Sequence, residues 1–300
     1  MRKASEVGGR PLSLSNLEKD LYPSYGFTKA EILEYYRRIS PFILPHLKGR
    51  ALTLKRYPNG VGEGFFFEKH CPSHRPSWVA TAELPRHDGG EMTVCLVNDL
   101  PTLIWVGNLA SIELHIPLAR ADSPQTPDCL VFDLDPGDQA GILECARVAL
   151  ILRDLLLPLR LEGFVKTSGQ KGIHLYVPLN RKEATFADTK QFSKTVAEAL
   201  QRNYPDLITA KMAKAERIKK VFINWSQNDA SKTMVSVYSL RAREEPFVSS
   251  PISWGELEDL AGQGDPEKLF ILPSAVLSRA EKGGDLFREV LVKKQRLPYS

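Results

Sequence analysis

The fold prediction starts from the stretch CLVFDLDPG at residues 129–137. It opens with a short apolar run, which is typical of a strand buried in a sheet. Side chains two apart in a strand face the same way, so Asp133 and Asp135 should project together, roughly 6.6–6.8 Å apart along the backbone. Phe132 and Leu134 would then face the core. The stretch therefore predicts a core strand that presents two carboxylates on one face.

Such a pair of carboxylates is suited to metal chemistry. Two like charges on one face repel each other unless a cation lies between them. Hard oxygen ligands suit Mg²⁺ or Mn²⁺. Two such ions, about 3.5–4 Å apart, can activate a 3′-hydroxyl and hold a triphosphate for in-line attack. The same spacing also fits an aspartate pair that caps the turn before Pro136, so this motif alone leaves both interpretations open.

Short strands are also expected on both sides of this stretch. β-branched and aromatic residues predict earlier strands at 51–57, 64–69, 92–98, 103–108 and 111–117. Two later hairpins are expected, formed by 164–169 with 172–178 and by 220–226 with 233–240.

Helices are expected between these strands. Thr28 with Glu31 has the spacing of a capping box, and the helix that follows should be disturbed at Pro41 and Pro45. The further helix signals are apolar residues at helical spacing over 141–157, a cap at Asp188 for a helix reaching about Arg202, and Ser253 with Glu256 as a second capping box.

The order of these elements lacks strict βαβ alternation, which favours an α+β fold over a doubly wound one. Hydrophobic residues make up 43% of the 300 residues, enough for a sizeable core. We predict a single domain over residues 1–300, with residues 1–11 as a flexible arm. The net charge of +4 is too small to prove nucleic-acid binding.

Cellular location is inferred from what the chain lacks. The start MRKASEVGGR has no apolar run behind it, so no signal peptide is expected. Residues 148–161 are apolar but broken by charges and a proline, so no membrane association is expected. The four cysteines form no CxxC pair, which favours a reduced, cytoplasmic protein.

The segment at 69–74 contains Cys71 and two histidines, but no partner pair at zinc-finger spacing, so a structural loop is favoured over a zinc site.

Two further segments change the interpretation of the acidic pair. KTSGQKGIH at residues 166–174 places a hydroxyl and a lysine beside glycines, a composition suited to phosphate oxygens, although an ordinary hairpin turn has the same composition. It is not a Walker P-loop. The third segment is VFINWSQN at residues 221–228, followed by YSLRAR.

Taken in order, VFDLDPG, KTSGQKGIHLYVPL and KVFINWSQN resemble the three motifs of the polymerase domains of bacterial ligase D, in the archaeo-eukaryotic primase superfamily. The similarity runs from about Leu14 to Trp254 and includes LSNLEKDLYP, LTLKRYPNGV and LVNDLPTLIWVGNLASIELH. The resemblance implies an α+β, primase-type (RRM-like) core with a mixed or antiparallel sheet flanked by helices.

The resemblance also implies an activity and partners. The expected activity is extension of DNA 3′ ends with nucleoside triphosphates, preferentially ribonucleotides, at gaps and double-strand breaks in non-homologous end joining. The expected cofactors are two Mn²⁺ or Mg²⁺ ions. The implied partners are DNA with a 5′-phosphorylated gap or broken end, Ku and a DNA ligase, and the implied location is the nucleoid in the cytoplasm.

One motif position departs from the family pattern. The family carries an aspartate in hDWSQN, and this chain has Asn224 there. The resemblance makes Asp133, Asp135 and Asn224 the catalytic, metal-binding set. Asparagine keeps one carbonyl oxygen but loses the negative charge. We therefore expect weaker metal binding and strongly reduced nucleotidyl transfer, with nucleotide and DNA binding largely kept.

The resemblance assigns the remaining site residues. The nucleotide-binding positions are His115, Ser168, Gly169, Lys171, Gln227 and Arg241. The positions that bind a DNA 5′-phosphate are Asn16, Lys19, Lys29 and Lys55, while Phe66 and Phe67 stack on the template strand. Without the resemblance, His115 would be read as a structural histidine, the lysines as surface residues, and 64–69 as a strand buried on both faces.

Two rival functions remain from the sequence, and one basic stretch has no assigned role. A binding module for DNA ends and 5′-phosphates, impaired in catalysis by Asn224, would bind DNA without extending it. A nuclease that uses the Asp133–Asp135 pair would shorten its substrate. The basic stretch over 211–220 could contact phosphates or be a solvated face, and no site is assigned there.

Overall fold

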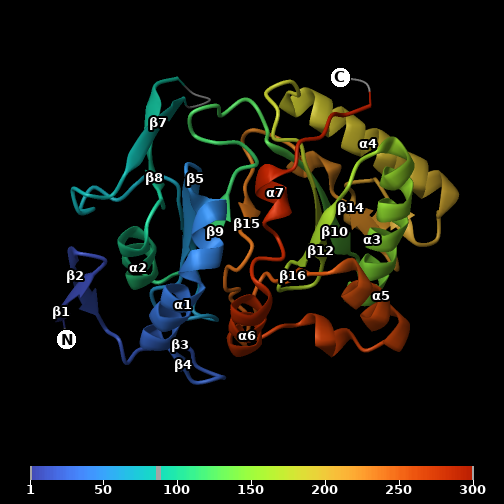
Figure 1. Ribbon diagram of the computed structural model, residues 1–300. Helices are drawn as coiled ribbons and strands as arrows, with labels where there is room; N and C mark the ends of the chain where they lie inside the picture. Colours follow the sequence, from blue (N-terminus) through green and yellow to red (C-terminus); the bar gives the residue numbers. More distant parts are fainter. Residues whose placement is uncertain (1, 86–88, 299–300) are drawn as a thin grey trace. The chain divides into compact units, whose positions relative to one another are not determined.

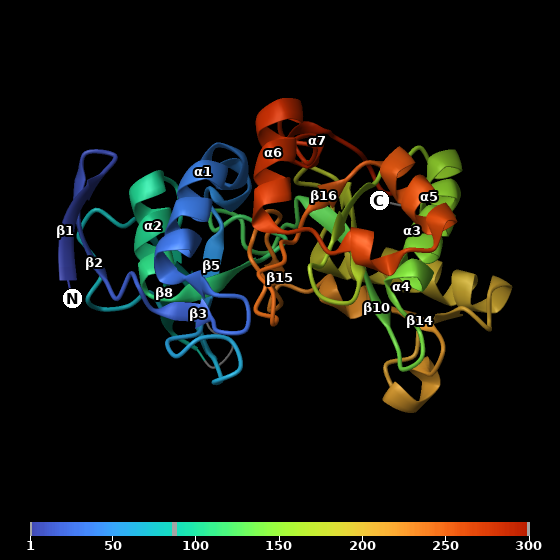
Figure 2. The same cartoon turned by 90° about the horizontal axis from the view of Figure 1, so that it is seen from below.

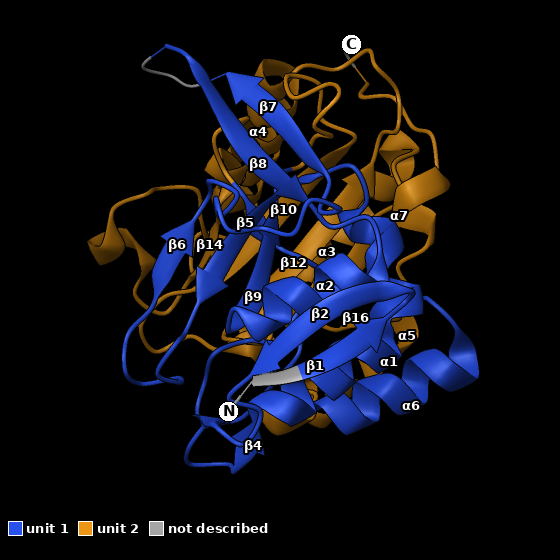
Figure 3. Ribbon diagram, turned by 90° about the vertical axis from the view of Figure 1, so that its left-hand side faces the viewer, with its two compact units in different colours: residues 1–117, 233–248, 272–285 blue, residues 118–232, 249–271, 286–300 orange. Residues whose placement is uncertain are grey.

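The computed structural model describes residues 2–85 and 89–298, and the chain divides into two compact units (Figure 3). Unit 1 contains Met1–Pro117, Thr233–Val248 and Leu272–Asp285. Unit 2 contains Leu118–Lys232, Ser249–Ile271 and Leu286–Ser300. The chain passes repeatedly from one unit to the other. The prediction of a single domain over residues 1–300 stays a prediction.

Unit 1 is built around a sheet with the strand order β15-β9-β5-β8-β7, in which β6 also pairs with β5. Its strand pairs are antiparallel. The elements of unit 1 are β1 (Arg2–Val7), β2 (Arg10–Ser15), β3 (Asp20–Tyr22), β4 (Phe27–Thr28), α1 (Lys29–Leu47), β5 (Ala51–Arg56), β6 (Phe66–Glu68), β7 (Thr81–Pro85), β8 (Glu91–Leu96), α2 (Leu100–Asn108), β9 (Ser111–Ile116), β15 (Met234–Val235) and α6 (Pro273–Gly283).

Helix α1 begins at the predicted capping box. The Thr28 hydroxyl accepts from the Glu31 N–H, and the Glu31 carboxylate accepts from the Thr28 N–H. The helix continues through Pro41 and Pro45, where the sequence predicted a disturbance. Its apolar face is buried to the end of the helix, and α1 packs against α2 and α6 (Figure 1). Burial of that face offsets the hydrogen bonds that the two prolines cannot make.

The segment 103–108, predicted as a strand, is helical, and this prediction was wrong. It belongs to α2, whose N-terminus is capped by Asp99 accepting from the Thr102 N–H. Seven of the nine residues of α2 are buried, so the helix is apolar around its circumference. An apolar run without a polar face carries no period that distinguishes a helix from a buried strand.

Unit 2 contains one six-stranded sheet with the order β13-β14-β10-β12-β11-β16. All its pairs are antiparallel except β13 with β14. Helix α3 packs against β10 and β12, and α4 against β10 (Figure 1). The elements of unit 2 are β10 (Cys129–Pro136), α3 (Ile142–Leu156), β11 (Phe164–Thr167), β12 (Ile173–Pro178), α4 (Phe186–Asn203), β13 (Ile208–Thr209), β14 (Val221–Ile223), β16 (Pro251–Ile252), α5 (Trp254–Gln263) and α7 (Glu289–Val292).

The stretch 129–136 forms β10, which lies between β14 and β12 in the sheet. Figure 2 shows β10 beside β14. Val131, Phe132 and Leu134 are fully buried. Both the core strand and the hairpin of β11 with β12 are confirmed. Antiparallel sheets flanked by helices also confirm the α+β fold class.

The second predicted hairpin was wrong. Strand β14 pairs with β10 and β13 in unit 2, whereas β15 pairs with β9 in unit 1. The residues between the two strands include a 3-10 turn rather than a tight hairpin loop. Both segments do contain strands, as their β-propensity predicted, but the predicted pairing of the two strands with each other was wrong. Pairing partners depend on contacts between distant segments, which propensity does not carry.

Local details differ from expectation at helix α4 and at the N-terminus and agree at helix α5. The cap of α4 is Thr185, and Asp188 is the acidic partner of its capping box. Ser253 caps α5 as expected. Residues 2–15 form the hairpin β1–β2 rather than the flexible arm predicted to residue 11. The backbone N–H of Ser15 donates to Asn108 at the end of α2, which anchors the hairpin.

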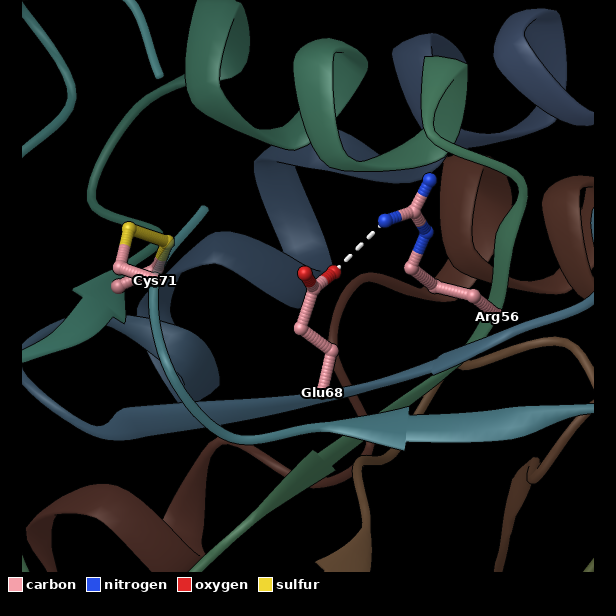
Figure 4. The surroundings of a disulfide bond; sticks show 4 residues. Arg56, Glu68 and Cys71 are labelled. Atoms are coloured by element: carbon pink, nitrogen blue, oxygen red, sulfur yellow. Dashed lines mark hydrogen bonds and ion pairs between the residues drawn. A yellow bond between two sulfur atoms is a disulfide. The ribbon is translucent and has the colours of Figure 1, made fainter. Parts of the chain in front are cut away.

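Two of the four cysteines are bonded, which corrects the expectation of four reduced thiols. Cys71 and Cys95 form a disulfide (Figure 4), whereas Cys129 and Cys145 are free and buried. The partners are 24 residues apart and meet because the loop after β6 returns to β8, where the Cys71 N–H donates to the Thr93 carbonyl. The structural interpretation of the loop at 69–74 agrees with this bond. Within the described ranges, no helix is long and apolar enough to cross a bilayer.

Candidate active site

The acidic pair lies at the end of β10 in unit 2. Asp133 is buried and Asp135 is partly exposed. Burial and the charge of Asp133 raise the pKa of the Asp135 carboxyl to about 7, against an opposing effect of Arg217. A shift of this kind is expected when two carboxylates share one face of a strand in a partly desolvated site. The arrangement favours the binding of a cation.

Asn224 reaches the pair from the neighbouring strand. The register pairs Leu134 with Ile223, so the residue after β14 emerges beside Asp133. The Asn224 backbone N–H donates to the Asp133 carbonyl at 2.8 Å. Its side-chain Nδ2 lies 3.2 Å from Asp133 Oδ2. The convergence of these two positions, expected from the ordered motifs, is confirmed.

The amide of Asn224 has a defined orientation. The Ser226 hydroxyl donates to Asn224 Oδ1 at 2.7 Å, and Lys232 Nζ donates to the same Ser226 hydroxyl at 2.8 Å. The amide nitrogen, which cannot bind a metal, therefore faces Asp133, while the amide oxygen faces Ser226. An asparagine amide is oriented by its hydrogen-bond partners, and here both ends agree.

Two other side chains approach Asp133. Gln227 donates from Nε2 to Oδ2 at 3.3 Å, and His174 Nε2 lies 3.3 Å from Oδ1. The other nitrogen of His174, Nδ1, lies 2.9 Å from Nζ of the fully buried Lys166. Because a lysine ammonium can only donate, Nδ1 accepts and the ring proton sits on Nε2, toward Asp133.

The predicted phosphate loop is a tight turn between β11 and β12. The Ser168 hydroxyl oxygen accepts from the N–H groups of Gln170 and Gly172, which leaves its own proton for an acceptor outside the turn. Gly169 adopts a positive φ of 67°. A side chain at Gly172 would meet the Leu134 carbonyl at 2.1 Å, so the turn can lie this close to β10 only with glycine there. Lys171 is exposed at the tip.

The donor set fits a divalent ion held by carboxylate oxygens. Asp133 and Asp135 supply hard ligands from one face of a strand. No group of three or more His, Cys, Asp and Glu side chains suited to a metal occurs in residues 2–85 and 89–298. The third position of the motif contributes a neutral amide instead of a carboxylate. The assignment of Asp133, Asp135 and Asn224 as metal ligands stays a prediction.

A second buried carboxylate, Glu113, organises predicted site residues in unit 1. Its oxygens lie 2.9 Å from His115 Nε2, 3.1 Å from Lys55 Nζ and 3.4 Å from Arg241 Nε. The Tyr57 hydroxyl donates to Glu113 at 3.0 Å. Burial alone would raise the pKa of Glu113, but the hydrogen bond from His115 and the charges of Arg241 and Lys55 hold it well below its usual range. Burial lowers the pKa of His115.

The predicted 5′-phosphate residues are only partly brought together. Lys29 is buried, and burial, with the charges of Arg56 and Lys19, lowers its pKa to about 8. Lys19 and Lys29 therefore share a basic cluster with Arg56, which the sequence did not single out. Asn16 is exposed in the turn just before Lys19, with a positive φ of 53°. Lys55, next to Arg56 on β5, instead contacts Glu113.

The two predicted stacking residues are exposed on β6, 45% for Phe66 and 54% for Phe67. The strand is therefore not buried on both faces, which was the alternative left open by the sequence. Arg56 lies over the Phe66 ring, and Phe67 packs edge-on to His115. Arg56 is held in place by an ion pair with Glu68 in the same strand pair (Figure 4).

The comparison with protein families agrees with the motif order. The family described as LigD, primase-polymerase domain, matches residues 28–287. This range includes the Asp133–Asp135 pair and Glu113. The chain belongs to this family. The resemblance drawn from the three ordered motifs is confirmed.

Curated LigD proteins are similar over nearly the whole chain. The multifunctional non-homologous end joining protein LigD of Mycolicibacterium smegmatis is 41% identical over 275 residues, 91% of this chain and 35% of that protein. LigD of Mycobacterium tuberculosis H37Rv is 38% identical over 97% of this chain and 38% of its own length. The bifunctional LigD of Bacillus subtilis is 31% identical, over 96% and 46%. The chain thus spans less than half the length of these LigD relatives.

A solved LigD structure has the same fold. The polymerase domain from Mycobacterium tuberculosis ligase D, solved in complex with DNA, aligns with a TM-score of 0.87 and 37% identity. The alignment covers 95% of this chain and 99% of that domain. The primase-type fold class implied by the LigD resemblance is confirmed.

Besides Arg56, sequence reasoning about this LigD-type domain missed three further residues. Lys166 and His174 lie within the quoted second motif but received no role, and Glu113 was passed over two residues before His115. Strand periodicity could have indicated Glu113, because residues two apart share a face. Nothing in the sequence indicates that Lys166 and His174 connect to Asp133, since these contacts join side chains on three strands, β11, β12 and β10.

Proposed function

We propose that this chain extends DNA 3′ ends with nucleoside triphosphates at gaps and double-strand breaks, as part of non-homologous end joining. The observation that carries the proposal is the acidic pair Asp133–Asp135, joined by Asn224 and Gln227, in a chain of the LigD primase-polymerase family. Mn²⁺ or Mg²⁺ bound at the pair would supply the charge that activates the 3′-hydroxyl and neutralises the triphosphate. The preference for ribonucleotides and cooperation with Ku and a ligase in the cytoplasm are part of the proposal.

The residues of the chain itself would bind and orient the nucleotide. Ser168 has a hydroxyl proton available for a phosphate oxygen, because its oxygen already accepts two backbone N–H groups. Lys171 adds a positive charge at the exposed tip of the same turn. For His115 and Arg241, the proposed contact with the nucleotide rests on the family resemblance. Their common partner Glu113 would keep both side chains in fixed positions.

Recognition of DNA would use separate surfaces of unit 1. The basic cluster of Lys19, Lys29 and Arg56 suits a 5′-phosphate, since a buried lysine loses less side-chain entropy on binding than an exposed one. Exposed Phe66 and Phe67 suit stacking on bases, which contributes about 1–3 kcal/mol per base in single-strand binding.

One observation favours a second function. The amide nitrogen of Asn224 faces Asp133 where the motif calls for a third carboxylate. A site of this kind would bind metal less tightly, so the chain could serve mainly as a binding module for DNA ends with little synthesis.

Labelled-primer extension separates these functions. The substrate is a gapped duplex with a 5′-phosphate in Mn²⁺, with ribonucleotides and deoxynucleotides compared. We expect slow extension by the native chain, favouring ribonucleotides, and at least about tenfold faster extension by Asn224→Asp, equivalent to about 1.4 kcal/mol of barrier. The charge-matched control is Asn203→Asp at the exposed end of α4, which should match the native rate.

Each outcome has a clear meaning. If the native chain binds the primer without extending it while Asn224→Asp extends it, the binding module impaired by Asn224 is correct. Shortening of the primer would instead indicate a nuclease. Equal rates for the native chain and Asn224→Asp would show that the missing charge has no effect.

A further inference from the structure

We propose that Asn224 is not a metal ligand but a fixed hydrogen-bond donor to Asp133, and that it limits this site to a single divalent cation. The inference concerns the metal content of the active site and rests on the proposed function only for the identity of the nucleotide. It departs from the role that the motif implies for this position.

The orientation of Asn224 is fixed from both ends. Lys232 Nζ can only donate, so the Ser226 oxygen accepts from it and the Ser226 proton points to Asn224 Oδ1. Turning the amide over would place Oδ1 against Asp133 Oδ2, two acceptors at 3.2 Å. It would also leave the Ser226 proton without its acceptor. The turned amide would therefore lose two hydrogen bonds, and its oxygen is kept away from any ion at the acidic pair.

Asp133 is surrounded by nitrogen donors. Asn224 and Gln227 both donate to Oδ2, and His174 approaches Oδ1. A carboxylate has about four lone-pair sites, so three of those of Asp133 face N–H groups. A second ion bridging positions 133 and 224 would have to displace the Asn224 donor and find a carboxylate that is not there.

Two lysines supply the charge that a second cation would otherwise supply. Lys166 reaches Asp133 through His174, and Lys232 reaches it through Ser226 and Asn224. Both relays end on an N–H directed at the carboxylate. Asp135, partly exposed on the same strand face, is then the main carboxylate for one divalent ion.

The number of bound ions can be measured directly. We would titrate Mn²⁺ into the native chain with a non-hydrolysable ribonucleoside triphosphate and follow free Mn²⁺ by electron paramagnetic resonance. The native chain should bind one ion, Asn224→Asp two, and the charge-matched control Asn203→Asp one. Two ions on the native chain would overturn the inference, whether or not Asn224→Asp folds.

A second measurement tests the orientation without a variant. The Asn224 side-chain amide, assigned by triple-resonance NMR, should keep its hydrogen-bonded ¹H and ¹⁵N shifts when Mg²⁺ and the same nucleotide are added. A large shift on Mg²⁺ addition would mean that the amide turns to bind the ion, and the inference would fail. Neither measurement depends on catalysis, so an inactive chain that binds one ion would overturn the proposed polymerase function and leave this inference standing.

Discussion

Asp133 in unit 2 and Glu113 in unit 1 are both buried carboxylates surrounded by nitrogen donors, yet their electrostatic settings are opposite. Glu113 contacts the charged groups of Lys55 and Arg241 directly, and its pKa is held low. Asp133 contacts lysines through intervening side chains and has a second carboxylate beside it, whose pKa is raised. Glu113 is therefore a complete internal ion cluster that orders side chains. The aspartate pair keeps excess negative charge that an external cation can neutralise.

The largest expected effect is the loss of the Glu113 charge. In Glu113→Gln, Lys55 and Arg241 remain largely buried without their anion, and breaking such a buried pair typically costs about 3–5 kcal/mol. Urea denaturation should show this loss in the free energy of unfolding. The matched control is Glu68→Gln, whose partner Arg56 is more exposed and where we expect at most about 1 kcal/mol. Equal effects of the two changes would contradict the idea of Glu113 as an organising anion.

The disulfide should add stability to unit 1 but not to unit 2, because the two cysteines of unit 2 are free. A loop of this length contributes roughly 3 kcal/mol in the chain-entropy description. Reductant should therefore lower the melting temperature of the native chain and leave a Cys71→Ser, Cys95→Ser variant unchanged. If reductant left the melting temperature of the native chain unchanged, the disulfide would not contribute to its stability.

The aspartate pair should make stability depend on pH. Because the folded pKa of Asp135 is near 7 and its ordinary value is 3.8, the folded state holds the proton more tightly. Stability should then fall as pH rises from about 4 to 7, by on the order of 2 kcal/mol. Denaturation of the native chain and Asp135→Asn across this range tests the effect. The variant should lack this part of the slope, and added Mn²⁺ should reduce it in the native chain; identical slopes would exclude Asp135 as the cause.

The smallest expected effect is a pH dependence of 5′-phosphate binding that comes from Lys29. Its pKa of about 8 means that the side chain loses its charge over the range in which most DNA-binding assays are done. The preference for a 5′-phosphate over a 5′-hydroxyl should weaken by ~1 kcal/mol between pH 7 and 9. Competition binding with the two DNA ends measures this. Lys29→Arg, which stays charged, should keep the preference at the higher pH, and a parallel decline in that variant would point away from Lys29.

Contiguous motifs were sufficient for the fold class, the family and the acidic pair. Residues 129–137 encode their own strand and the common direction of Asp133 and Asp135, because side-chain alternation is a local property of extended backbone. The ordered motifs also indicated that position 224 joins the pair. The same local reasoning failed at 103–108, where an apolar helix has no polar face, and at the second hairpin, whose strands pair in different units.

Only the tertiary structure decided which way the Asn224 amide points, which residues surround Asp133, and that Glu113 joins His115, Lys55 and Arg241. Each of these depends on hydrogen bonds between segments far apart in the chain. Asparagine in the third motif indicated a lost charge, but whether its oxygen or its nitrogen faces the carboxylates depends on Ser226 and Lys232. Alternation and propensity describe how a segment folds, whereas contacts between segments determine what its side chains can bind.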